Sequence, residues 1–368
     1  MKGVFPQQLL RELCRNDVIR GLDSDGIQPA SLDLSVAEEG YAVPGSMLPL
    51  KGESVRDLAR AYARRTLDLE SPNVLVRGEV YVVRLRESLN LPSDLAVYAN
   101  SKSSTGRIDL QTRMLCDGNP RYDKVPFGYR GELWLELIPK SFDVRLRAGD
   151  SLNQAIFFHR RSFLGGDDLE AIHATSPLLY EPDQTPHPFD PSIGPSSADA
   201  SGILMTINLD LDVVGFVAKK SFQPVDLAER DLDPAEYFEP ILRPKRGALF
   251  LSREAFYILS THEFISIPPL FAVEMLPYDT SAGEFRAHYA GFFDPGFGYG
   301  AAGEVRGTPA VLEVRPYEDD LILRHRQPVC RMAFEDLVEA PHQVYGAGVG
   351  SHYAAQRGPK LAKYFRES

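Results

Sequence analysis

The chain has 368 residues, which favours two domains, because domains usually span roughly 100–200 residues. With 43% hydrophobic and 25% charged residues it has the composition of a globular protein, which argues against a disordered, fibrous or membrane-embedded chain. Its net charge of −11 argues against a broad nucleic-acid surface but is compatible with a small anion held in a local basic pocket.

Cysteine usage and hydropathy indicate the compartment. Cys14, Cys116 and Cys330 are far apart and form neither a disulfide framework nor a zinc-binding spacing. No apolar run approaches the ~18 residues of a membrane span. The first residues also carry charges where a signal peptide has an apolar stretch. We therefore expect a cytoplasmic protein with no membrane partner.

In chain order, the pattern predicts mostly β structure with few helices. Helix-forming residues at helical spacing predict helices over Pro6–Cys14 and Val55–Arg65 and one turn over Pro234–Phe238. Short β-branched or aromatic runs between Gly and Pro residues predict strands. These runs are Glu79–Leu85, Glu132–Leu137, Ala155–Phe158, Phe271–Leu276 and Ala310–Val314.

Three matches at one nearly constant offset indicate an internal duplication. Ser31-Leu32-Asp33-Leu34 recurs as Asn208-Leu209-Asp210-Leu211, Leu91-Pro92 as Ile267-Pro268, and Leu135-Glu136 as Leu312-Glu313. We predict a first repeat over 1–174, a linker over 175–201, a second repeat over 202–345 and a basic C-terminal lid over 346–368. The Pro- and Ser-rich stretch at 175–201 could instead be a long functional loop inside one domain.

The first candidate site is the polar segment Asn100–Leu110. It holds Lys102, Arg107, a glycine and hydroxyl side chains directly after a predicted strand, and these groups suit phosphate oxygens. It is not a P-loop, because GxxxxGK[ST] is absent. A solvated polar turn is the alternative interpretation.

The second candidate is a pair of glutamates, Glu136 and Glu313, in apolar strands. Burial raises the pKa of a carboxyl group and suits it to proton transfer near neutrality. The alternative is that strand alternation points both carboxylates to solvent.

Two further segments could contact a ligand. The turn Asp294-Pro295-Gly296 after His288 would place an acceptor beside closely approaching backbone, although a plain hairpin turn explains it equally well. The tail after Gly350 is basic and aromatic, so it is either a lid over an anion or a frayed end.

Taken together, these segments resemble the dCTP deaminases of the trimeric dUTPase superfamily, in a long form with two tandem repeats. Lys102-Ser103-Ser104 followed by Arg107 and Asp109-Leu110 matches the family's phosphate and catalytic segment, with Lys for Arg at 102 and Asp for Gly at 109. His288 to Gly296, followed by Gly307 and Leu312-Glu313, matches a later segment, apart from an insertion at 299–306. The early Ser31–Leu34 strand and the closing Gln356–Tyr364 stretch also look like the family.

The resemblance implies a mainly β fold of two tandem dUTPase-like distorted barrels, of the β-clip or jelly-roll type, with a few short helices. It also implies zinc-free hydrolytic deamination of dCTP to dUTP and ammonia. In such enzymes a water attacks C4 of cytosine, a strand glutamate takes and returns protons, and a Ser and an Arg orient the water and the amino group. The zinc deaminase signature is missing from the sequence. Mg²⁺ would arrive with the triphosphate, and a homo-oligomer, with a trimer favoured, would follow from the family's sites between domains.

The two halves depart from the family pattern in complementary ways. The first keeps Ser-Ser-x-x-Arg but has lost Asp-Pro-Gly, whereas the second keeps Asp-Pro-Gly and Glu313 but has Asp279–Gly283, without the Arg, in place of the Ser-Ser element. We therefore predict a composite site with Glu313, Ser103 and Arg107 as catalytic residues and Glu136 as second candidate base or structural relic. The predicted substrate-binding residues are Lys102, Ser104, Asp294, Gly296, Tyr353, Gln356, Lys360, Lys363 and Tyr364.

Three alternatives remain open at this point. The enzyme could also hydrolyse dUTP, because both reactions would use the same pocket. The chain could be a nucleotide-binding regulator with a dead site, or a β-sandwich interaction module that binds no nucleotide.

Overall fold

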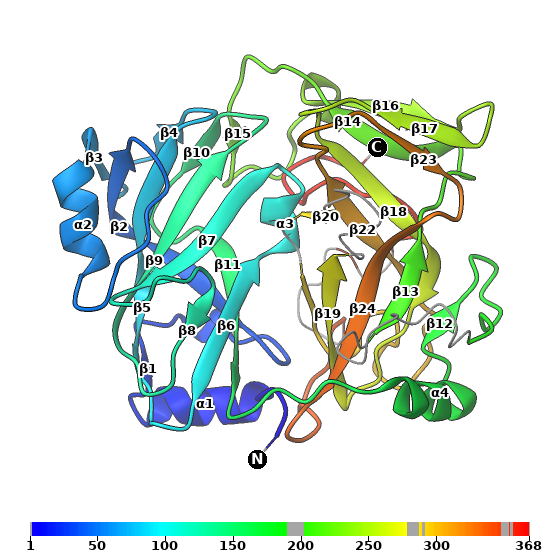
Figure 1. Cartoon of the computed structure of the whole chain (residues 1–368), viewed down its shortest axis with the longest axis horizontal. Helices are drawn as coiled ribbons and strands as arrows, with labels where there is room; N and C mark the ends of the chain where they lie inside the picture. The colour runs from blue at the N-terminus through cyan, green and yellow to red at the C-terminus, as the bar shows by residue number, and fades with distance from the viewer. Residues whose placement is uncertain are drawn as a thin grey trace. The chain divides into compact units, whose positions relative to one another are not determined.

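A computed structural model describes residues 2–189, 202–277, 287–288, 291–346, 353 and 356–367 (Figure 1). At Ser24, Ala287 and His288 the description covers the backbone. The chain forms two compact units. The N-terminal unit comprises Phe5–His159, Lys220–Tyr237 and Ala362–Ser368, and the C-terminal unit comprises Met1–Val4, Arg160–Lys219 and Phe238–Leu361.

The N-terminal unit is built mainly of strands. Its elements are α1 (Gln7–Arg15), β1 (Ile19–Arg20), a 3₁₀ turn (Ser24–Gly26), β2 (Leu32–Val43), α2 (Val55–Tyr62), β3 (Arg65–Asp68), β4 (Asn73–Leu75), β5 (Val80–Asn90), β6 (Ala96–Ser101), α3 (Ser103–Gly106), β7 (Leu110–Cys116), β8 (Lys124–Val125), β9 (Arg130–Pro139), β10 (Val144–Leu146), β11 (Ser151–Phe158), β15 (Val225–Asp226) and a second 3₁₀ turn (Pro234–Glu236). Its main sheet has the order β7-β9-β5-β2-β11-β6-β8, and β15-β10-β4 form a smaller sheet.

The C-terminal unit repeats this plan. Its elements are α4 (Gly166–Thr175), β12 (Leu179–Tyr180), β13 (Ile203–Thr206), β14 (Val213–Ala218), β16 (Phe238–Leu242), β17 (Ala248–Leu251), β18 (Tyr257–Ile265), β19 (Phe271–Pro277), β20 (Ala287–His288), β21 (Phe292–Phe293), β22 (Thr308–Val314), β23 (Leu321–Arg324) and β24 (Pro328–Asp336). Its strands pair in the orders β16-β14-β18-β22-β20 and β13-β24-β19-β21, and β17 pairs with β23. The predicted mainly β fold of two tandem repeats is confirmed.

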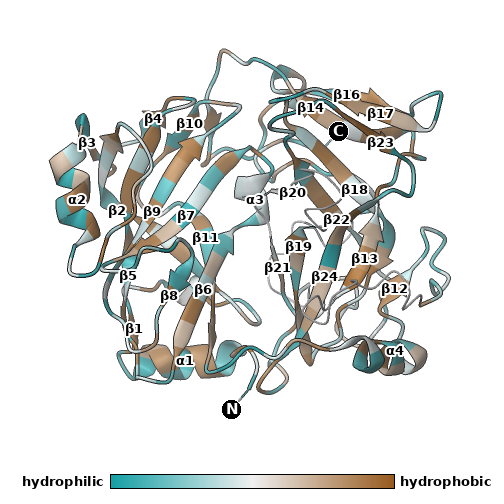
Figure 2. Cartoon of the chain, in the orientation of Figure 1, coloured by the Kyte–Doolittle hydropathy of each residue, from teal (hydrophilic) through white to brown (hydrophobic). Residues whose placement is uncertain are grey.

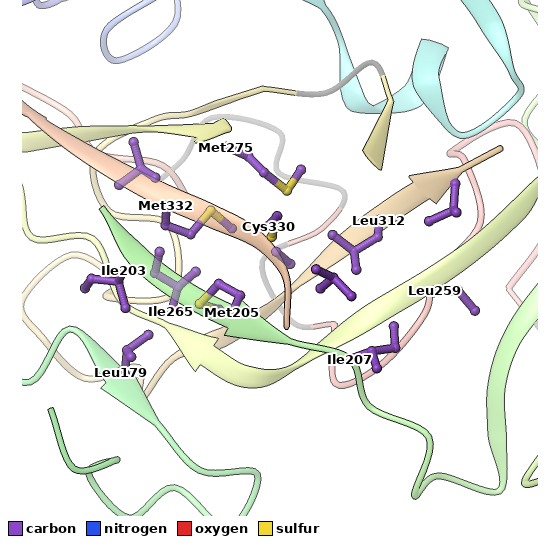
Figure 3. Packing of buried hydrophobic residues seen from close by; sticks show 14 of the residues in the cluster. Leu179, Ile203, Met205, Ile207, Leu259, Ile265, Met275, Leu312, Cys330 and Met332 are labelled. Atoms are coloured by element: carbon purple, nitrogen blue, oxygen red, sulfur yellow. The ribbon is translucent and has the colours of Figure 1, made fainter. Parts of the chain in front are cut away.

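The strands form because their apolar side chains are buried between covered faces. Figure 2 shows bands of hydrophobic and hydrophilic colour along β18 and β7. In the C-terminal unit, side chains from β13, β18, β22 and β24 gather in one core, including Met205, Leu259, Leu312 and Met332 (Figure 3). β22 is buried along its whole length, in agreement with its largely apolar sequence.

A buried glutamate holds the same β-bulge in each unit. The backbone N–H of Ser35 in β2 donates to both carboxylate oxygens of Glu87, at 3.1 and 3.0 Å, where β5 is bulged. The N–H of Thr206 in β13 donates to Glu263 at 2.7 Å, beside the bulge of β18. Burial raises the pKa of Glu87 to about 7. The interval between the two glutamates along the chain equals that between Leu91-Pro92 and Ile267-Pro268, which agrees with the predicted duplication.

Strand register corrects one of the three sequence matches. β2 pairs with β11 so that Ser35 lies opposite Ser151, and β13 pairs with β24 so that Thr206 lies opposite Pro328. Thr206 is therefore the counterpart of Ser35, at a shorter offset than the sequence match implies. Leu209–Leu211 lies between β13 and β14, because the second unit divides the long strand β2 into two strands. The similarity of the two Leu-Asp-Leu segments does not reflect equivalent positions.

The compact units divide the chain at different residues from the predicted repeats. After the N-terminal residues Met1–Val4, the C-terminal unit resumes at Arg160, because α4 and β12 belong to it and repeat α1 and β1. Leu179 of β12 pairs with Ile265 of β18, just as Ile19 of β1 pairs with Leu89 of β5. Part of the predicted linker is thus a strand of the second unit, and residues 190–201 lie outside the described residues. The helices α3 and α4 have no counterpart in the sequence prediction, whereas the helices over Pro6–Cys14 and Val55–Arg65 are confirmed within a few residues. In the part of the chain that the structure describes, no helix is long and apolar enough to cross a membrane.

Truncation of a core side chain should destabilise the protein far more than the same truncation at the surface. Leu259 is fully buried, so Leu259→Ala should lower the free energy of unfolding by about 3 kcal/mol, through lost transfer energy and a residual cavity. The matched control Leu242→Ala, at a side chain that is 68% exposed, should change it by less than ~0.5 kcal/mol. Urea denaturation compares the two, and equal effects would contradict the described core.

Candidate active site

The Ser-Ser-x-x-Arg segment forms a short buried helical turn in the N-terminal unit. α3 follows β6, and the N–H groups of Thr105 and Gly106 donate to the carbonyl of Lys102, at 2.9 and 3.0 Å. Ser104, Thr105 and Arg107 are all nearly inaccessible to solvent. The segment is therefore not a solvated polar turn, because most of its side chains are buried.

Asp109 stands where the family pattern has glycine. It adopts a left-handed backbone conformation, which is the reason that glycine is favoured at this position. Its φ is +55°, a region that glycine populates freely and that Asp tolerates better than most residues. Its carboxylate accepts a hydrogen bond from Ser141 Oγ at 2.6 Å, and its carbonyl accepts from the N–H of Lys140. The departure from the pattern therefore preserves the turn that places Arg107.

Lys102 is held by carboxylate and hydroxyl groups of neighbouring strands. Its ammonium donates to Asp33 of β2 and to Ser151 Oγ of β11, the latter at 3.3 Å. Asp33 belongs to the early Ser-Leu-Asp-Leu motif. Through this contact the motif orients the side chain of Lys102. The Lys102 side chain remains 18% exposed, and its ammonium keeps donors for a further anion.

The charge of Lys363, in the C-terminal tail, interacts with the charges of Lys102 and Asp33. Burial, followed by the neighbouring charges of Lys102 and Arg230, lowers the pKa of Lys363 to about 8, although Asp33 and Asp150 oppose the shift. Three cations therefore gather in the N-terminal unit around the end of β6. Such a cluster suits a polyanion such as a triphosphate.

Glu136 is buried and tightly paired within its own unit. Arg113 of β7 donates to it through Nε at 2.9 Å and also through a terminal guanidinium nitrogen, and Ser46 and Tyr122 each donate at 3.2 Å. The Arg113 guanidinium also lies over the Tyr122 ring, 4.0 Å from its centroid. A carboxylate held this way has the surroundings of a structural ion pair.

Glu313 occupies the equivalent position in β22 with different neighbours. It is fully buried, and strand register places it opposite His288 of β20, as Glu136 lies opposite Arg113 of β7. A histidine thus replaces the arginine that lies opposite Glu136. The solvent-facing alternative is wrong for both glutamates, since each has no exposed surface.

The connection after the first long strand also distinguishes the two glutamates. In the N-terminal unit, residues 44–64 join β2 to β3, carry α2 and cover Glu136: Ser46 donates to the carboxylate, and Val55 and Ala59 pack with Trp134 of β9. In the C-terminal unit, the equivalent connection runs from β14 to β16. Most of it, Lys220–Tyr237, packs with the N-terminal unit instead. Residues 44–64 therefore cover Glu136 in the first repeat, whereas the equivalent connection of the second repeat packs mostly with the other unit.

The Asp294-Pro295-Gly296 turn is part of the architecture of the C-terminal unit. The N–H of Gly296 donates to Ile267 O at 2.9 Å, and its φ of +95° favours glycine. A Cβ at this position would lie 2.6 Å from Val344 Cβ, so no side chain fits there. Asp294 is half-buried at the start of the turn.

The predicted tail residues separate into two groups. Tyr353, Gln356 and Lys360 belong to the C-terminal unit, where Gln356 Nε2 donates to Pro309 O of β22 at 2.7 Å, on the strand that carries Glu313. Lys363 and Tyr364 belong to the N-terminal unit, and Tyr364 is buried. The tail is thus packed rather than frayed at these described positions. The predicted counterpart of the Ser-Ser element, Asp279–Gly283, lies outside the described residues.

Sequence reasoning missed Arg113, Asp150 and Arg230 around these sites. Arg230 lies in Lys220–Tyr237, where the predicted turn over Pro234–Phe238 is confirmed as a 3₁₀ turn but carried no functional signal. Arg113 could have been found, because it precedes Glu136 in the first repeat much as His288 precedes Glu313 in the second. Within the described ranges, no group of three or more His, Cys, Asp or Glu side chains is arranged to hold a metal ion.

Comparisons with known proteins divide the chain into an N-terminal and a C-terminal part. The model of the 2'-deoxycytidine 5'-triphosphate deaminase (DCD) N-terminal domain matches residues 1–161, and that of the C-terminal domain of the same family matches residues 167–365. The chain belongs to the dCTP deaminase family.

Two known proteins are similar to this dCTP deaminase family member over different shares of its chain. A crystal structure of 2'-deoxycytidine 5'-triphosphate deaminase from Agrobacterium tumefaciens is 36% identical, with a TM-score of 0.82 over 92% of this chain and 99% of that one. A dCTP deaminase from Ignicoccus hospitalis is 26% identical over 144 residues, which are 39% of this chain and 75% of that protein.

Loss of the arginine beside Glu136 should destabilise the family member's N-terminal unit. Arg113→Met would leave a fully buried carboxylate without its cation, which should lower the free energy of unfolding by about 3 kcal/mol. Arg121→Met, on an exposed arginine between β7 and β8, is the matched control and should change the free energy of unfolding by less than ~0.5 kcal/mol. If urea denaturation finds both variants equally stable, the ion pair has no structural role.

Proposed function

We propose that this chain is a dCTP deaminase, which converts dCTP and water to dUTP and ammonia without zinc. Membership of the family over nearly the whole chain supports this proposal. The observation that carries it is Glu313, a fully buried carboxylate on the strand where the family's sequence pattern has its proton-transferring glutamate. A carboxyl group positioned beside the reacting atoms can take up and give back protons.

In this mechanism each residue has a defined task. Glu313 takes a proton from the water that attacks C4 of cytosine and passes it to N3. It then takes the proton of the new hydroxyl group and gives it to the amino group, so that the C4–N bond breaks, ammonia leaves and the C4 carbonyl of uracil forms. Ser103 and Arg107, held by the α3 turn, orient the water and the amino group. Such positioned proton transfer typically contributes roughly 10²–10⁴-fold to a rate.

The remaining predicted residues would bind the substrate. Lys102, Ser104 and Lys363 suit the triphosphate, and Asp294 suits a donor group of the sugar or base. Tyr353, Gln356, Lys360, Tyr364 and the backbone at Gly296 stay predicted contacts. Mg²⁺ would come with the triphosphate, held mainly by phosphate oxygens, and a cytoplasmic homo-oligomer, with a trimer favoured, stays a prediction.

The reaction itself can be tested by an ammonia-release screen with dCTP, CTP and dCMP in the presence of Mg²⁺ and without added zinc. The proposal expects ammonia from dCTP and dUTP as the nucleotide product. Appearance of dUMP and pyrophosphate would identify the bifunctional alternative. Tight dCTP binding without ammonia would identify a regulator with a dead site, and failure to bind any nucleotide would leave the interaction module.

Paired glutamate substitutions should assign the base. Glu313→Gln should lower kcat roughly 10²–10⁴-fold, because an amide cannot carry the proton. Glu136→Gln should retain turnover within a few-fold, since the paired carboxylate is structural. Ammonia release from folded samples of both variants, checked by circular dichroism, provides the comparison. If the Glu136 variant alone loses turnover, Glu136 is the base and the assignment of Glu313 is wrong.

The pH profile should reveal Lys363. Because its pKa in the free protein is about 8, Lys363 is charged below that pH and becomes neutral as the pH rises through it. A neutral amine binds a triphosphate less well, so kcat/KM for dCTP should fall above about pH 8. Lys363→Arg keeps its charge and should flatten this fall. An unchanged profile in the variant would assign the fall to another group.

A further inference from the structure

One segment of the chain connects two strands of the C-terminal unit but belongs to the N-terminal unit. Lys220–Tyr237 joins β14 to β16, both strands of the C-terminal unit, yet it packs with the N-terminal unit. There β15 pairs in parallel with β10, with Val225 opposite Val144, and Asp226 accepts hydrogen bonds from Arg145 and Arg147 at 3.2 and 2.8 Å. The segment is thus firmly attached through backbone and charge.

The C-terminal tail is attached to this segment through its backbone. The N–H of Leu232 donates to Tyr364 O at 3.0 Å, and the N–H of Arg366 donates to Leu232 O at 3.1 Å. This is a parallel bridge between Leu232 and Phe365. Two reciprocal backbone bonds fix the direction and the register of the tail.

Side chains strengthen the same attachment. The rings of Phe365 and Tyr237 meet edge to face with centroids 5.3 Å apart, and Tyr237 in turn packs on Phe142 at 5.6 Å. Arg366 forms an ion pair with Asp233 at 2.7 Å, and the Arg230 guanidinium lies 5.4 Å from the centroid of the Tyr364 ring. Phe365 and Tyr237 are both buried, so the tail contributes to a small apolar core.

This attachment determines where Lys363 lies. Lys363 stands between the buried residues Ala362 and Tyr364, and its charge interacts with Lys102, Arg230, Asp33 and Asp150. Lys102 adjoins the Ser103–Gly106 turn. Tail residues held by Lys220–Tyr237 therefore bring a cation beside the predicted triphosphate contacts.

We propose that Lys220–Tyr237 is a dock for the C-terminal tail, which holds Lys363 beside Lys102 before any nucleotide binds. Phe365 and Tyr237 are then positioning residues for a nucleoside triphosphate, acting through Lys363. The proposal rests on the proposed function for its substrate and on the contacts within the N-terminal unit for the dock itself. It assigns a role to a connection that in the other repeat covers Glu136.

Hydrogen exchange on the full-length protein without nucleotide tests the dock directly. The amide of Leu232 should exchange slowly, because it donates to Tyr364. In a chain that ends at Leu361 this amide should exchange at least about tenfold faster, because its acceptor is gone. Phe365→Ala should also accelerate it, whereas Phe127→Ala, on an exposed phenylalanine of the same unit, should leave it unchanged. Equally fast exchange in the unmodified and shortened chains would overturn the dock.

Steady-state kinetics with dCTP test whether the docked tail positions Lys363 for the substrate. Phe365→Ala should raise KM about fivefold with kcat within about twofold, the loss expected for one aromatic contact that positions a binding group. Phe365→Tyr should restore KM. Faster exchange with an unchanged KM would overturn the positioning role. Absence of ammonia release from the unmodified protein would refute the proposed function, and the exchange experiment would still decide whether the dock exists.

Discussion

A carboxylate in the middle of a strand whose two faces are both covered needs a compensating partner, because an isolated buried charge is strongly disfavoured. Both repeats place a glutamate at this position, Glu136 in β9 and Glu313 in β22. The N-terminal unit meets the requirement with Arg113, Ser46 and Tyr122. The C-terminal unit has His288 in register at the position of Arg113, so a histidine stands on the neighbouring strand where the first repeat has an arginine.

The connection that follows the first long strand also differs between the two units, in line with the different surroundings of Glu136 and Glu313. Residues 44–64 are needed in the N-terminal unit, since they supply Ser46 and the apolar side chains of α2 that close the face around Trp134. Lys220–Tyr237 has no such duty in the C-terminal unit and packs with the N-terminal unit. A duplicated chain can thus keep one copy of a connection as structural cover and use the other for a different purpose.

The sequence predicted the parts of this organisation that depend on local pattern. The apolar runs at Glu132–Leu137 and Ala310–Val314 are buried strands, and the match of Leu135-Glu136 with Leu312-Glu313 is confirmed by the register of β9 and β22. The Leu-Asp-Leu match failed because short apolar-polar alternation recurs by chance, and the pairing of Thr206 with β24 was needed to correct it. α4 and β12 were missed since their sequences resemble α1 and β1 only weakly, and their role depends on the long-range pairing of Leu179 with Ile265. The site residues on α3 were predictable from residue type, whereas Arg230 was not, because its importance depends on contacts with a tail that is distant in the sequence.

Holding Lys363 in a buried position near Lys102 and Arg230 is unfavourable by itself, and the lowered pKa of Lys363 is the sign first of lost hydration and then of repulsion by the two neighbouring cations. The folded chain tolerates it because the neighbouring tail residues Ala362, Tyr364 and Phe365 bury apolar surface and form backbone hydrogen bonds at the same time. A triphosphate placed among the three cations would bring opposite charge to them and so offset their mutual repulsion. Cations fixed in advance also need no reorganisation when the polyanion arrives, which is the general advantage of a preorganised electrostatic site. The aromatic contact of Phe365 with Tyr237 thus acts on the substrate through charge, although neither ring carries one.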